Sequence, residues 1–582
     1  MKKFLSLFAA ALMVAVACNK KDPEPKPDPT PDPTPATPDL VLTTPKIVDV
    51  AGESSIYTVK FNAGKTWEAS LSYFDENESG VVLSKEKGLA GDAQELKVTF
   101  QGLTEEQMGR LIQLDLKAGS TTESILFFQG LVFLPDNEEE VPTISVAGGK
   151  YNLNILTNMD VTIKKYDGAE EAFPWAPVTI NQDEAAHKIS LAFDVAANTG
   201  YDARTAYVKF TLPEIQVPVL DDEGNPTGET TDMVTRFYLA QEGHSKLEWQ
   251  TLLGEDFNVA DAATASVALF DGKLLVCDGV AVHTVDPATG KFNGKLETGD
   301  LPVQCIANDD EGNLLFANLG VQDALYEVYA VKADDKSLAN PVHLIHFVND
   351  AWSGSTGIDK VAAKGNVFGN GIVTAMYGGV ISYGGLSYTL YWSINGGKAA
   401  ESYYNEWNPV VNNPDKGWTL TTPELSDDLW VSNRAVFVAA GPTASDGFFY
   451  GGYDGLYNVN YYNGTDWSVA IEGAGNWGGG PQAMHVTTWN RKKILAFMQM
   501  GYTWWDEGWG MPSYLWIADV TDPANAIVLS NAVYDNLEDQ IISGGTENSS
   551  LDVLPVVDGN DLVVYFVDSS QGHLAKVRFP KL

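Results

Sequence analysis

Hydrophobic and polar residues alternate with a period of two through most of the chain beyond residue 40, in short runs. Residues 56–61 and 96–100 are typical of this pattern. Because successive side chains of a strand point to opposite faces, the pattern predicts half-buried β-strands about ten residues apart. Helical periodicity is scarce, so we expect the chain to be all-β.

Two regions of this kind precede the main body. Residues 41–135 and 141–247 each predict a β-sandwich, and the acidic stretch 136–140 separates them. Each region holds one Trp that is expected to pack between the two sheets, Trp67 in the first and Trp175 in the second. A role for these two rings as ligand platforms is the alternative.

From residue 248 to 582 the chain is richer in Gly and Trp, and strands pair as hairpins at repeated intervals. Asp271-Gly272 is a two-residue turn between apolar runs, and similar turns lie near residues 309–312, 365–366, 445–447, 490–492 and 558–560. Spacings of about 40 to 80 residues predict the four-stranded blades of a β-propeller, with roughly six to eight blades. A jelly roll or a large pair of sandwiches is the alternative.

The first residues predict export and a lipid anchor. A short positive segment and the apolar run 4–17 form a signal peptide, residues 1–17, which is too short to span a bilayer. Ala15-Val16-Ala17-Cys18 resembles the lipobox of bacterial lipoproteins, which implies that Cys18 becomes the lipid-bearing N-terminus. An ordinary cleaved signal is the alternative.

Residues 18–40 then form a stalk. Pro at nearly every second position favours polyproline II, a semi-rigid spacer of roughly 60 Å. The lysine-then-acidic stretch 19–24 resembles the export signal of Bacteroidetes surface lipoproteins. This resemblance implies a surface-exposed protein of the outer membrane, with a periplasm-facing anchor as the alternative.

The two predicted sandwiches share an order of features. Arg110 and Arg204 each precede an alternating strand, and the regions close on Gln129-Gly130 and on Gln241-Glu242-Gly243. This order resembles the BACON domain, an immunoglobulin-like module, and Asn158, Asn198 and Arg204 of the second copy occupy places that the family favours. In the first copy, Gln101 stands near the place of Asn198. The BACON name implies carbohydrate binding, but we expect both copies to act as spacers.

Composition excludes some classes of function. With 77 Asp+Glu against 37 Lys+Arg, the formal net charge is −40, which argues against a nucleic-acid partner. An apolar fraction of 44% excludes disorder throughout, and three Cys exclude a disulfide scaffold. Cys277 and Cys305 lie in the first two predicted blades, where either a disulfide or two buried thiols could form.

Catalytic and metal-binding motifs are missing from the sequence. His343 and His346 are the one close His pair, and residues three apart on a regular strand face opposite sides, so a shared metal is not expected. No cofactor is implied. An extracellular glycoside hydrolase or lyase stays open as an alternative, because carboxylate pairs cannot be placed from sequence.

Aromatic residues are the most informative feature. Twelve of the fifteen Trp lie between Trp352 and Trp516, and two aromatic stretches, 403–418 and 501–512, are rich in Gly, Asn, Pro and Asp. Such loops suit sugars, because a flat ring stacks on a pyranose while carboxylates and amides bind its hydroxyls. The candidate ligand-binding residues are Tyr403, Tyr404, Trp407, Trp418, Trp477, Trp504, Trp505, Asp506 and Trp509. Trp392 and Tyr461-Tyr462 could extend them, and packing between blades is the alternative.

In plan, the chain is similar to the surface glycan-binding lipoproteins of Bacteroidetes polysaccharide-utilisation systems. This resemblance implies that aromatic loops of the C-terminal propeller bind a polysaccharide or oligosaccharide beside neighbouring surface proteins. A protein-interaction scaffold at the cell surface is the alternative, together with the enzyme named above.

Overall fold

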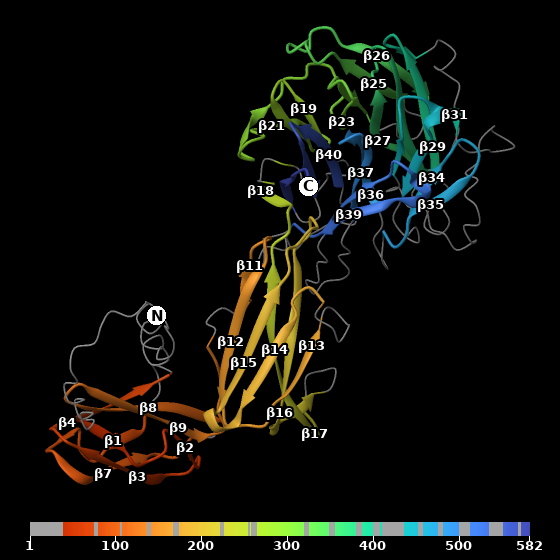
Figure 1. Ribbon diagram of the computed structural model, residues 1–582. Helices are drawn as coiled ribbons and strands as arrows, with labels where there is room; N and C mark the ends of the chain where they lie inside the picture. The colour runs from red at the N-terminus through yellow and green to blue at the C-terminus, as the bar shows by residue number, and fades with distance from the viewer. Residues whose placement is uncertain are drawn as a thin grey trace, which may run out of the picture. The chain divides into compact units, whose positions relative to one another are not determined.

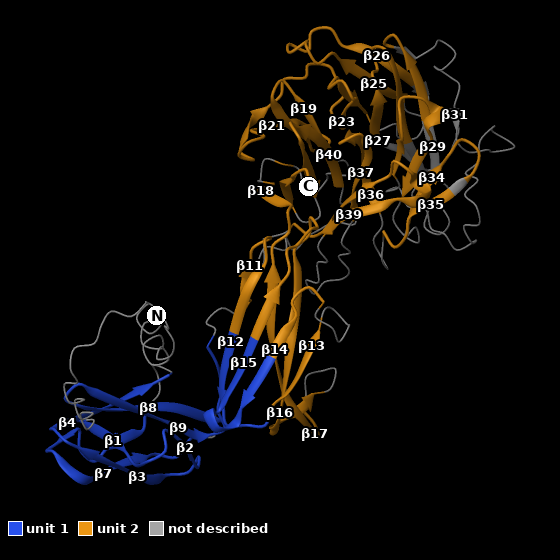
Figure 2. Cartoon of the chain, in the orientation of Figure 1, with its two compact units in different colours: residues 1–137, 153–160, 180–191 blue, residues 138–152, 161–179, 192–582 orange. Residues whose placement is uncertain are grey.

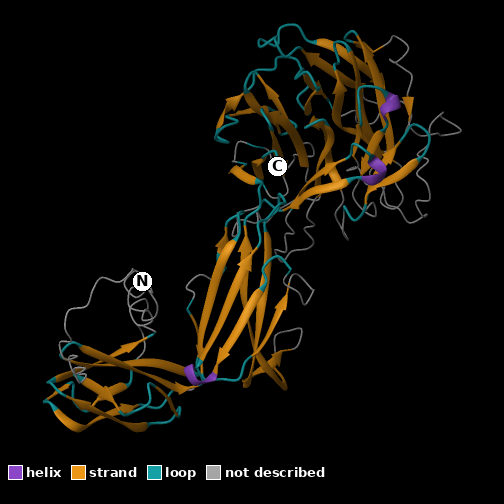
Figure 3. Cartoon of the chain, in the orientation of Figure 1, coloured by secondary structure: helices purple, strands orange, loops and turns teal. Residues whose placement is uncertain are grey.

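The computed structural model is built from β-strands (Figure 1). It describes residues 39–74, 79–104, 107–136, 141–166, 174–220, 226–253, 257, 265–318, 325–348, 356–379, 387–399, 408–409, 436–451, 458–474, 481–499, 513–534, 551–568 and 572–582. The helices within these ranges are short 3-10 turns, η1 (Glu184–Ala186), η3 (Ala444–Asp446) and η4 (Pro523–Asn525) (Figure 3). The all-β prediction is confirmed. No helix in the described ranges is long and apolar enough to cross a membrane.

The chain divides into two compact units (Figure 2). Unit 1 comprises residues 1–137, 153–160 and 180–191, and unit 2 comprises residues 138–152, 161–179 and 192–582.

Two sheets near the N-terminus enclose one core. The first has the order β1 (Leu40–Leu42), β3 (Ser55–Ala63), β7 (Gly91–Phe100), β5 (Val81–Leu83). The second has the order β2 (Ile47–Val50), β9 (Thr121–Gly130), β8 (Gly109–Ala118), β4 (Trp67–Tyr73), β6 (Lys87–Gly88). Alternate residues of both sheets form a single apolar cluster around Trp67, which is 1% exposed and meets Phe61 edge to face. The predicted core role of Trp67 is confirmed.

Two further sheets follow. One has the order β10 (Phe133–Pro135), β12 (Gly149–Thr157), β15 (Lys188–Val195), β14 (Val178–Asp183), and the other β11 (Thr143–Ile144), β17 (Pro226–Gln241), β16 (Arg204–Leu220), β13 (Thr162–Tyr166). Trp175 is buried here, as predicted, beneath the Arg204 guanidinium. Residues 133–135, which the sequence assigned to the first region, instead pair with β12.

A buried polar network recurs in both places. Arg110 Nε donates to Gln129 Oε1 (2.7 Å), and Arg204 Nε donates to Gln241 Oε1 (2.8 Å). Each Gln amide then donates to backbone carbonyls of its own region, Gln129 to Gln101 and Gln241 to Ala196. The strands that end in these Gln residues each take a short parallel partner, β2 on β9 and β11 on β17.

Within the described residues from 246 to 582, six antiparallel sheets follow. The first five are β19 (Ser266–Phe270), β20 (Lys273–Cys277), β21 (Val282–Val285), β22 (Phe292–Lys295); β23 (Cys305–Asn308), β24 (Leu314–Ala317), β25 (Leu325–Val331), β26 (Val342–Val348); β27 (Thr356–Gly365), β28 (Asn370–Gly379), β29 (Ser387–Asn395), β30 (Lys398–Ala399); β32 (Val436–Ala439), β33 (Phe448–Gly451), β34 (Val459–Tyr462), β35 (Trp467–Ile471); and β36 (Pro481–Trp489), β37 (Lys492–Gln499), β38 (Tyr514–Asp519), β39 (Ile527–Ala532). In the third sheet, β31 (Asn408–Pro409) also pairs with β29.

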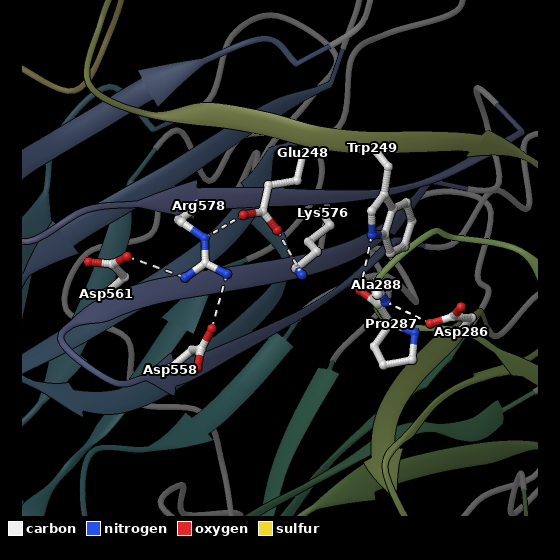
Figure 4. A network of polar contacts seen from close by, with 9 residues as sticks. All are labelled: Glu248, Trp249, Asp286, Pro287, Ala288, Asp558, Asp561, Lys576 and Arg578. Carbon is white, nitrogen blue, oxygen red and sulfur yellow. Dashed lines mark hydrogen bonds and ion pairs between the residues drawn. The ribbon is translucent and has the colours of Figure 1, made fainter.

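The sixth sheet combines both ends of this region. It has the order β18 (Lys246–Leu252), β42 (His573–Phe579), β41 (Asp561–Asp568), β40 (Leu551–Asp558), so its outer strand comes from the start of the region. Glu248 on β18 accepts hydrogen bonds from Arg578 and Lys576 on β42, and Arg578 also pairs with Asp558 and Asp561 (Figure 4). Trp249 Nε1 donates to Pro287 O (3.1 Å), which ties β18 to the β21–β22 turn.

The hairpins follow from local turn chemistry. Asp271 and Gly272 both have positive φ (49° and 69°), as a two-residue type I′ turn requires, and Asn490 and Arg491 repeat this geometry. Both turns lie where the sequence predicted them.

The first strands of the six sheets contact one another in cyclic order. β19 contacts β23, and the contacts continue through β27, β32, β36 and β40, which returns to β19. The first residues of neighbouring first strands contact one another: Ser266 Oγ accepts from Ile306 N (2.9 Å), and Asp552 accepts from Val267 N (2.8 Å). The first strands therefore run in the same direction. None of the sheets closes on itself within the described residues.

Candidate functional site

The six sheets have two distinct ends. We call the end at which each first strand begins the entry end, and the opposite end, where the first strand turns into the second, the hairpin end. Because the strands alternate in direction, connections from second to third strands, and from fourth strands to the next sheet, leave at the entry end.

All nine candidate ligand-binding residues lie outside the described residues. Tyr403, Tyr404 and Trp407 lie between β30 and β31, which both pair with β29 on the outer edge of the third sheet, and Trp418 lies between β31 and β32. Trp477 lies between β35 and β36, and Trp504, Trp505, Asp506 and Trp509 lie between β37 and β38. The connections that hold Trp418, Trp477 and residues 504–509 each lead to or from a described strand at the entry end, whereas β30 pairs with Ile394 and Asn395 at the hairpin end. Cys18 also falls outside the described residues.

Two residues expected to extend this set lie at the hairpin end instead. Tyr461 and Tyr462 close β34 there, and the Tyr461 hydroxyl donates to Asp446 O (2.9 Å) while its ring packs on Phe449. Trp392 is 2% exposed and packs against Tyr326 in the core. The expectation that Trp392 extends a ligand platform is therefore wrong, because its neighbours cover the ring. Tyr461 and Tyr462 lie at the end of the sheets opposite the connection that holds Trp477.

A small cavity of about 30 Å³ lies among the first strands near the entry end. Residues of seven strands line it, including Ser266, Cys305, Lys360, Thr374 and Asp552. A volume of this size holds about one water molecule and excludes a sugar ring. Among the described residues that line it, Asp552 is the one carboxylate.

Lys360 and Asp552 supply the charges of this cavity. Lys360 has a positive φ (56°) at a register shift between β27 and β28, and its Nζ donates to Gln482 O (2.8 Å) and to Leu551 O. Burial raises the pKa of the Asp552 carboxyl to about 6, although Lys360 and the Val267 amide oppose this shift. The hydrogen bonds of these two residues link four first strands, β19, β27, β36 and β40. The sequence missed the pair because the bulge that turns Lys360 inward depends on the neighbouring strand.

Titratable groups also gather at the hairpin end. Lys364 Nζ pairs with Asp310 Oδ1 (2.5 Å) and donates to Val486 O (2.8 Å). Burial and the nearby Lys364 charge hold the pKa of His485 well below its usual range, although Asp310 opposes them. These bonds join first strands to one another.

The two cysteines are free thiols, so the possible disulfide between Cys277 and Cys305 is not formed. Cys277 belongs to the cluster around Phe316, and Cys305 belongs to the cluster around Trp392. The Cys277 thiol instead donates to Val303 O (2.8 Å). Burial raises the pKa of both thiols, that of Cys305 to about 11, so both stay protonated and unreactive.

A groove of about 530 Å³ in the N-terminal region is lined by Trp67, Lys87, Leu89 and Lys117, among others. The Trp67 ring lies beneath it but offers no open face, since Gly88 lies directly against the indole. The groove therefore lacks the stacking surface that sugar binding needs.

One polar cluster was not foreseen. Glu327 on β25 lies close to both His343 and His346 on β26. The expectation that the two His side chains face opposite sides is wrong, because a register shift between β25 and β26 interrupts the alternation. Sequence spacing alone could not reveal it.

Comparison with known families identifies the C-terminal region. A family model described as "Domain of unknown function (DUF8500)" matches residues 255–579, more than half of the 582-residue chain. The chain therefore belongs to the DUF8500 family. No curated protein matches it in sequence.

Solved structures share little with the whole chain. A Bacteroides ovatus GH5 xyloglucanase in complex with a XXXG heptasaccharide is 20% identical, over 19% of this chain and 22% of its own length, with a TM-score of 0.14. The chain thus spans about a fifth of that enzyme. The titin domains Z1Z2 in complex with telethonin are 15% identical over 36% of this chain and 98% of theirs, at a TM-score of 0.14. An endo-fucoidan hydrolase of glycoside hydrolase family 107 is 11% identical over 36% and 29%, also at 0.14. TM-scores this low establish no common fold over the chain.

Proposed function

We propose that this protein is a cell-surface lipoprotein that binds an extracellular glycan at the entry end of a six-bladed β-propeller. The single observation that carries the proposal is topological: three connections, which hold six of the nine candidate residues (Trp418, Trp477, Trp504, Trp505, Asp506 and Trp509), lead to or from strands at one end of the six sheets. Aromatic and polar residues from three connections would then meet a ligand on one face.

The strand order supports the architecture. Six sheets in chain order, five of four strands and one of five, with first strands in cyclic contact, would suit a propeller with six blades. A strand from the start of the region completes the last blade. The two N-terminal sheet pairs have matching strand orders and the same Arg–Gln network, which supports two immunoglobulin-like BACON copies.

The two ends of the propeller would have separate roles. β18, which receives the chain from the sandwiches, begins at the hairpin end, where Lys246 pairs with Arg578 near the 558–561 turn. The chain would therefore enter the propeller at the end opposite the ligand. Lipid on Cys18 would anchor the chain to the outer membrane, and the sandwiches would act as spacers.

Binding without hydrolysis suits the centre of the propeller. A cavity of about 30 Å³ admits no sugar, and hydrolysis needs two carboxylates at defined separation where the described lining offers Asp552 alone. The ligand would rest on the entry-end connections. A net charge of −40 favours neutral over acidic glycans.

Affinity electrophoresis of the protein through gels that contain one polysaccharide each tests the proposal. We expect retardation by at least one neutral glycan, loss of retardation in the Trp504→Ala/Trp505→Ala variant, and no release of reducing sugar. Each stacking Trp should contribute about tenfold in affinity. Mobility unchanged by every glycan in a broad panel would overturn the proposal.

A further inference from the structure

We propose that Glu327, His343 and His346 form a binding site for a divalent transition-metal ion of the zinc type. Glu327 Oε1 lies 3.3 Å from His343 Nε2 and 3.8 Å from His346 Nδ1. One donor atom from each residue lies within 4.8 Å of the other two. This site is separate from the proposed glycan-binding connections and does not depend on them.

A β-bulge brings the two histidines to one face. Glu327 pairs with His346 and Val328 with Ile345, but Tyr329 pairs with His343, so Leu344 is an extra residue on β26. Leu344 and Ile345 are consecutive, yet both are buried in the same apolar cluster. Their shared inward orientation leaves His343 and His346 together on the opposite face, beside Glu327.

The donor set and its spacing select the class of ion. Tetrahedral bonds of about 2.0–2.1 Å place donor atoms about 3.4 Å apart, close to the two distances observed. Two imidazoles with one carboxylate suit Zn²⁺ and its neighbours, whereas Ca²⁺ and Mg²⁺ prefer all-oxygen sites. The three side chains are each 27% to 41% exposed, so a fourth coordination position would be open to water.

Neighbouring groups hold the donors in place. The Tyr329 ring stacks on His343 (centroids 4.4 Å apart, planes 6° apart), and its hydroxyl donates to Glu327 Oε1 (3.3 Å). The Glu327 amide donates to Asn318 Oδ1 (2.7 Å). His343 Nε2 is itself buried and makes no hydrogen bond within the described part of the chain, as expected of an atom that faces a cation site.

Metal titration of the full chain tests the site. Protein freed of metal by a chelator is titrated with Co²⁺, whose visible absorption reports coordination, and then with Zn²⁺ in competition with a chromophoric chelator. Excess Mg²⁺ throughout occupies weak carboxylate sites. We expect one tight Zn²⁺ per chain, which displaces Co²⁺ and removes its absorption bands.

Substitutions then assign the donors. His343→Gln, His346→Gln and Glu327→Gln should each weaken Zn²⁺ binding about 100-fold, while Tyr329→Phe, which keeps the stacked ring, should weaken it about tenfold. His244→Gln is the matched control, because His244 lies on a backbone carbonyl, Asn198 O, in another region, and it should bind Zn²⁺ as the parent does. Circular dichroism of the metal-free variants checks that each is folded. The proposal is overturned if the three folded donor variants keep the parent affinity, or if the parent binds no Zn²⁺ more tightly than its weak carboxylate sites do.

Discussion

Asp552 and His485 lie on neighbouring first strands of the six-sheet region, and their pKa values are displaced in opposite directions. Burial raises the pKa of Asp552 to about 6 from an ordinary 3.8. Burial and Lys364 lower the pKa of His485. Both residues therefore couple folding to pH in the mildly acidic range, but with opposite signs.

Asp552→Asn should stabilise the protein increasingly as pH rises. The folded state holds the Asp552 proton more tightly than the unfolded chain does, so ionisation opposes folding between about pH 4 and pH 6. The Asn variant avoids this cost and can still accept from the Val267 amide. Its free energy of unfolding relative to the parent should rise by about 3 kcal/mol across that window, as urea unfolding followed by Trp fluorescence would measure. A difference independent of pH would contradict the assigned pKa.

His485→Gln should show the reverse dependence. Below about pH 6.5, His485 binds a proton in the unfolded chain but not in the folded protein, so the parent loses stability as pH falls. The Gln variant lacks this loss and should gain stability over the parent only on the acidic side, in the same urea assay. A stability difference between variant and parent that does not change with pH would contradict the lowered pKa of His485.

At the scale of single residues, the sequence predicted burial better than chemistry. Trp67 and Trp175 were expected in cores and lie there, because a large ring within an alternating strand has one side to occupy. Trp392 lies in a core for the same reason, against expectation. Lys360 and the His343–His346 pair could not be placed, because each depends on a bulge that the partner strand determines.

At the scale of strands, the Arg–Gln hydrogen-bond networks join neighbouring strands within each N-terminal region. Gln129 joins β9 to Arg110 on β8 and to the Gln101 carbonyl, with its side chain fully buried. Gln241 does the same for Arg204 and Ala196. The carbonyl in each region also accepts from the Arg Nη2 atom, so one Gln side chain, one guanidinium and one backbone carbonyl bond to one another.

Gln129→Leu should destabilise the N-terminal region by about 3 kcal/mol. The substitution removes the acceptor of the buried Arg110 Nε and one of the two side-chain donors to the Gln101 carbonyl, and Leu restores neither. Hydrogen–deuterium exchange of amides in β8 and β9 should accelerate about 100-fold, while β36–β42 stay unchanged. Gln113→Leu on β8, where the side chain bonds only Asp115, is the control and should change exchange little. Equal effects of the two variants would refute the importance of the network.

Strands and hairpins were largely predictable, because period-two alternation and Asp-Gly turns are local signals. The sequence did not predict which sheet each short edge strand joins. Residues 133–135, expected in the first region, pair with β12 of the next sheet. Pairing between strands distant in sequence leaves no local signature, and β18 on β42 is a second example.

At the scale of the whole molecule, the six-sheet region depends on β18 to complete its last sheet. Burial raises the pKa of Glu248, but hydrogen bonds from Arg578 and Lys576 outweigh it and hold that pKa below its usual range (Figure 4). The ionised Glu248 carboxylate therefore stabilises the pairing of β18 with β42 at neutral pH. This contribution is lost as pH falls through the lowered pKa of Glu248.

Glu248→Gln should selectively weaken the pairing of β18 with β42. The loss of one partner from a charged network costs about 1 kcal/mol, because Arg578 keeps Asp558 and Asp561. Amide exchange should accelerate in β18 and not in β40 or β41. Glu297→Gln, at an exposed carboxyl, is the matched control. If Glu248→Gln leaves amide exchange in β18 unchanged, the role given to the Glu248–Arg578 ion pair is contradicted.

Much of the overall organisation could be anticipated: an all-β chain, two similar N-terminal regions, and a repetitive body with hairpins at the predicted turns. The cyclic contact of six first strands could not, since it joins β40 to β19 across most of the region. Candidate ligand residues were chosen by composition alone. The strand order then shows from which end of the sheets the connections that hold Trp418, Trp477 and residues 504–509 leave.

Affinity electrophoresis against the retarding glycan, with variants at the two ends compared, tests the central claim most directly. Trp504→Ala/Trp505→Ala and Trp418→Ala alter two different entry-end connections, whereas Tyr462→Ala alters the hairpin end. The account predicts that both entry-end variants lose retardation and that the Tyr462 variant migrates as the parent does. Retardation that survives both entry-end variants, or that only Tyr462→Ala removes, would contradict it.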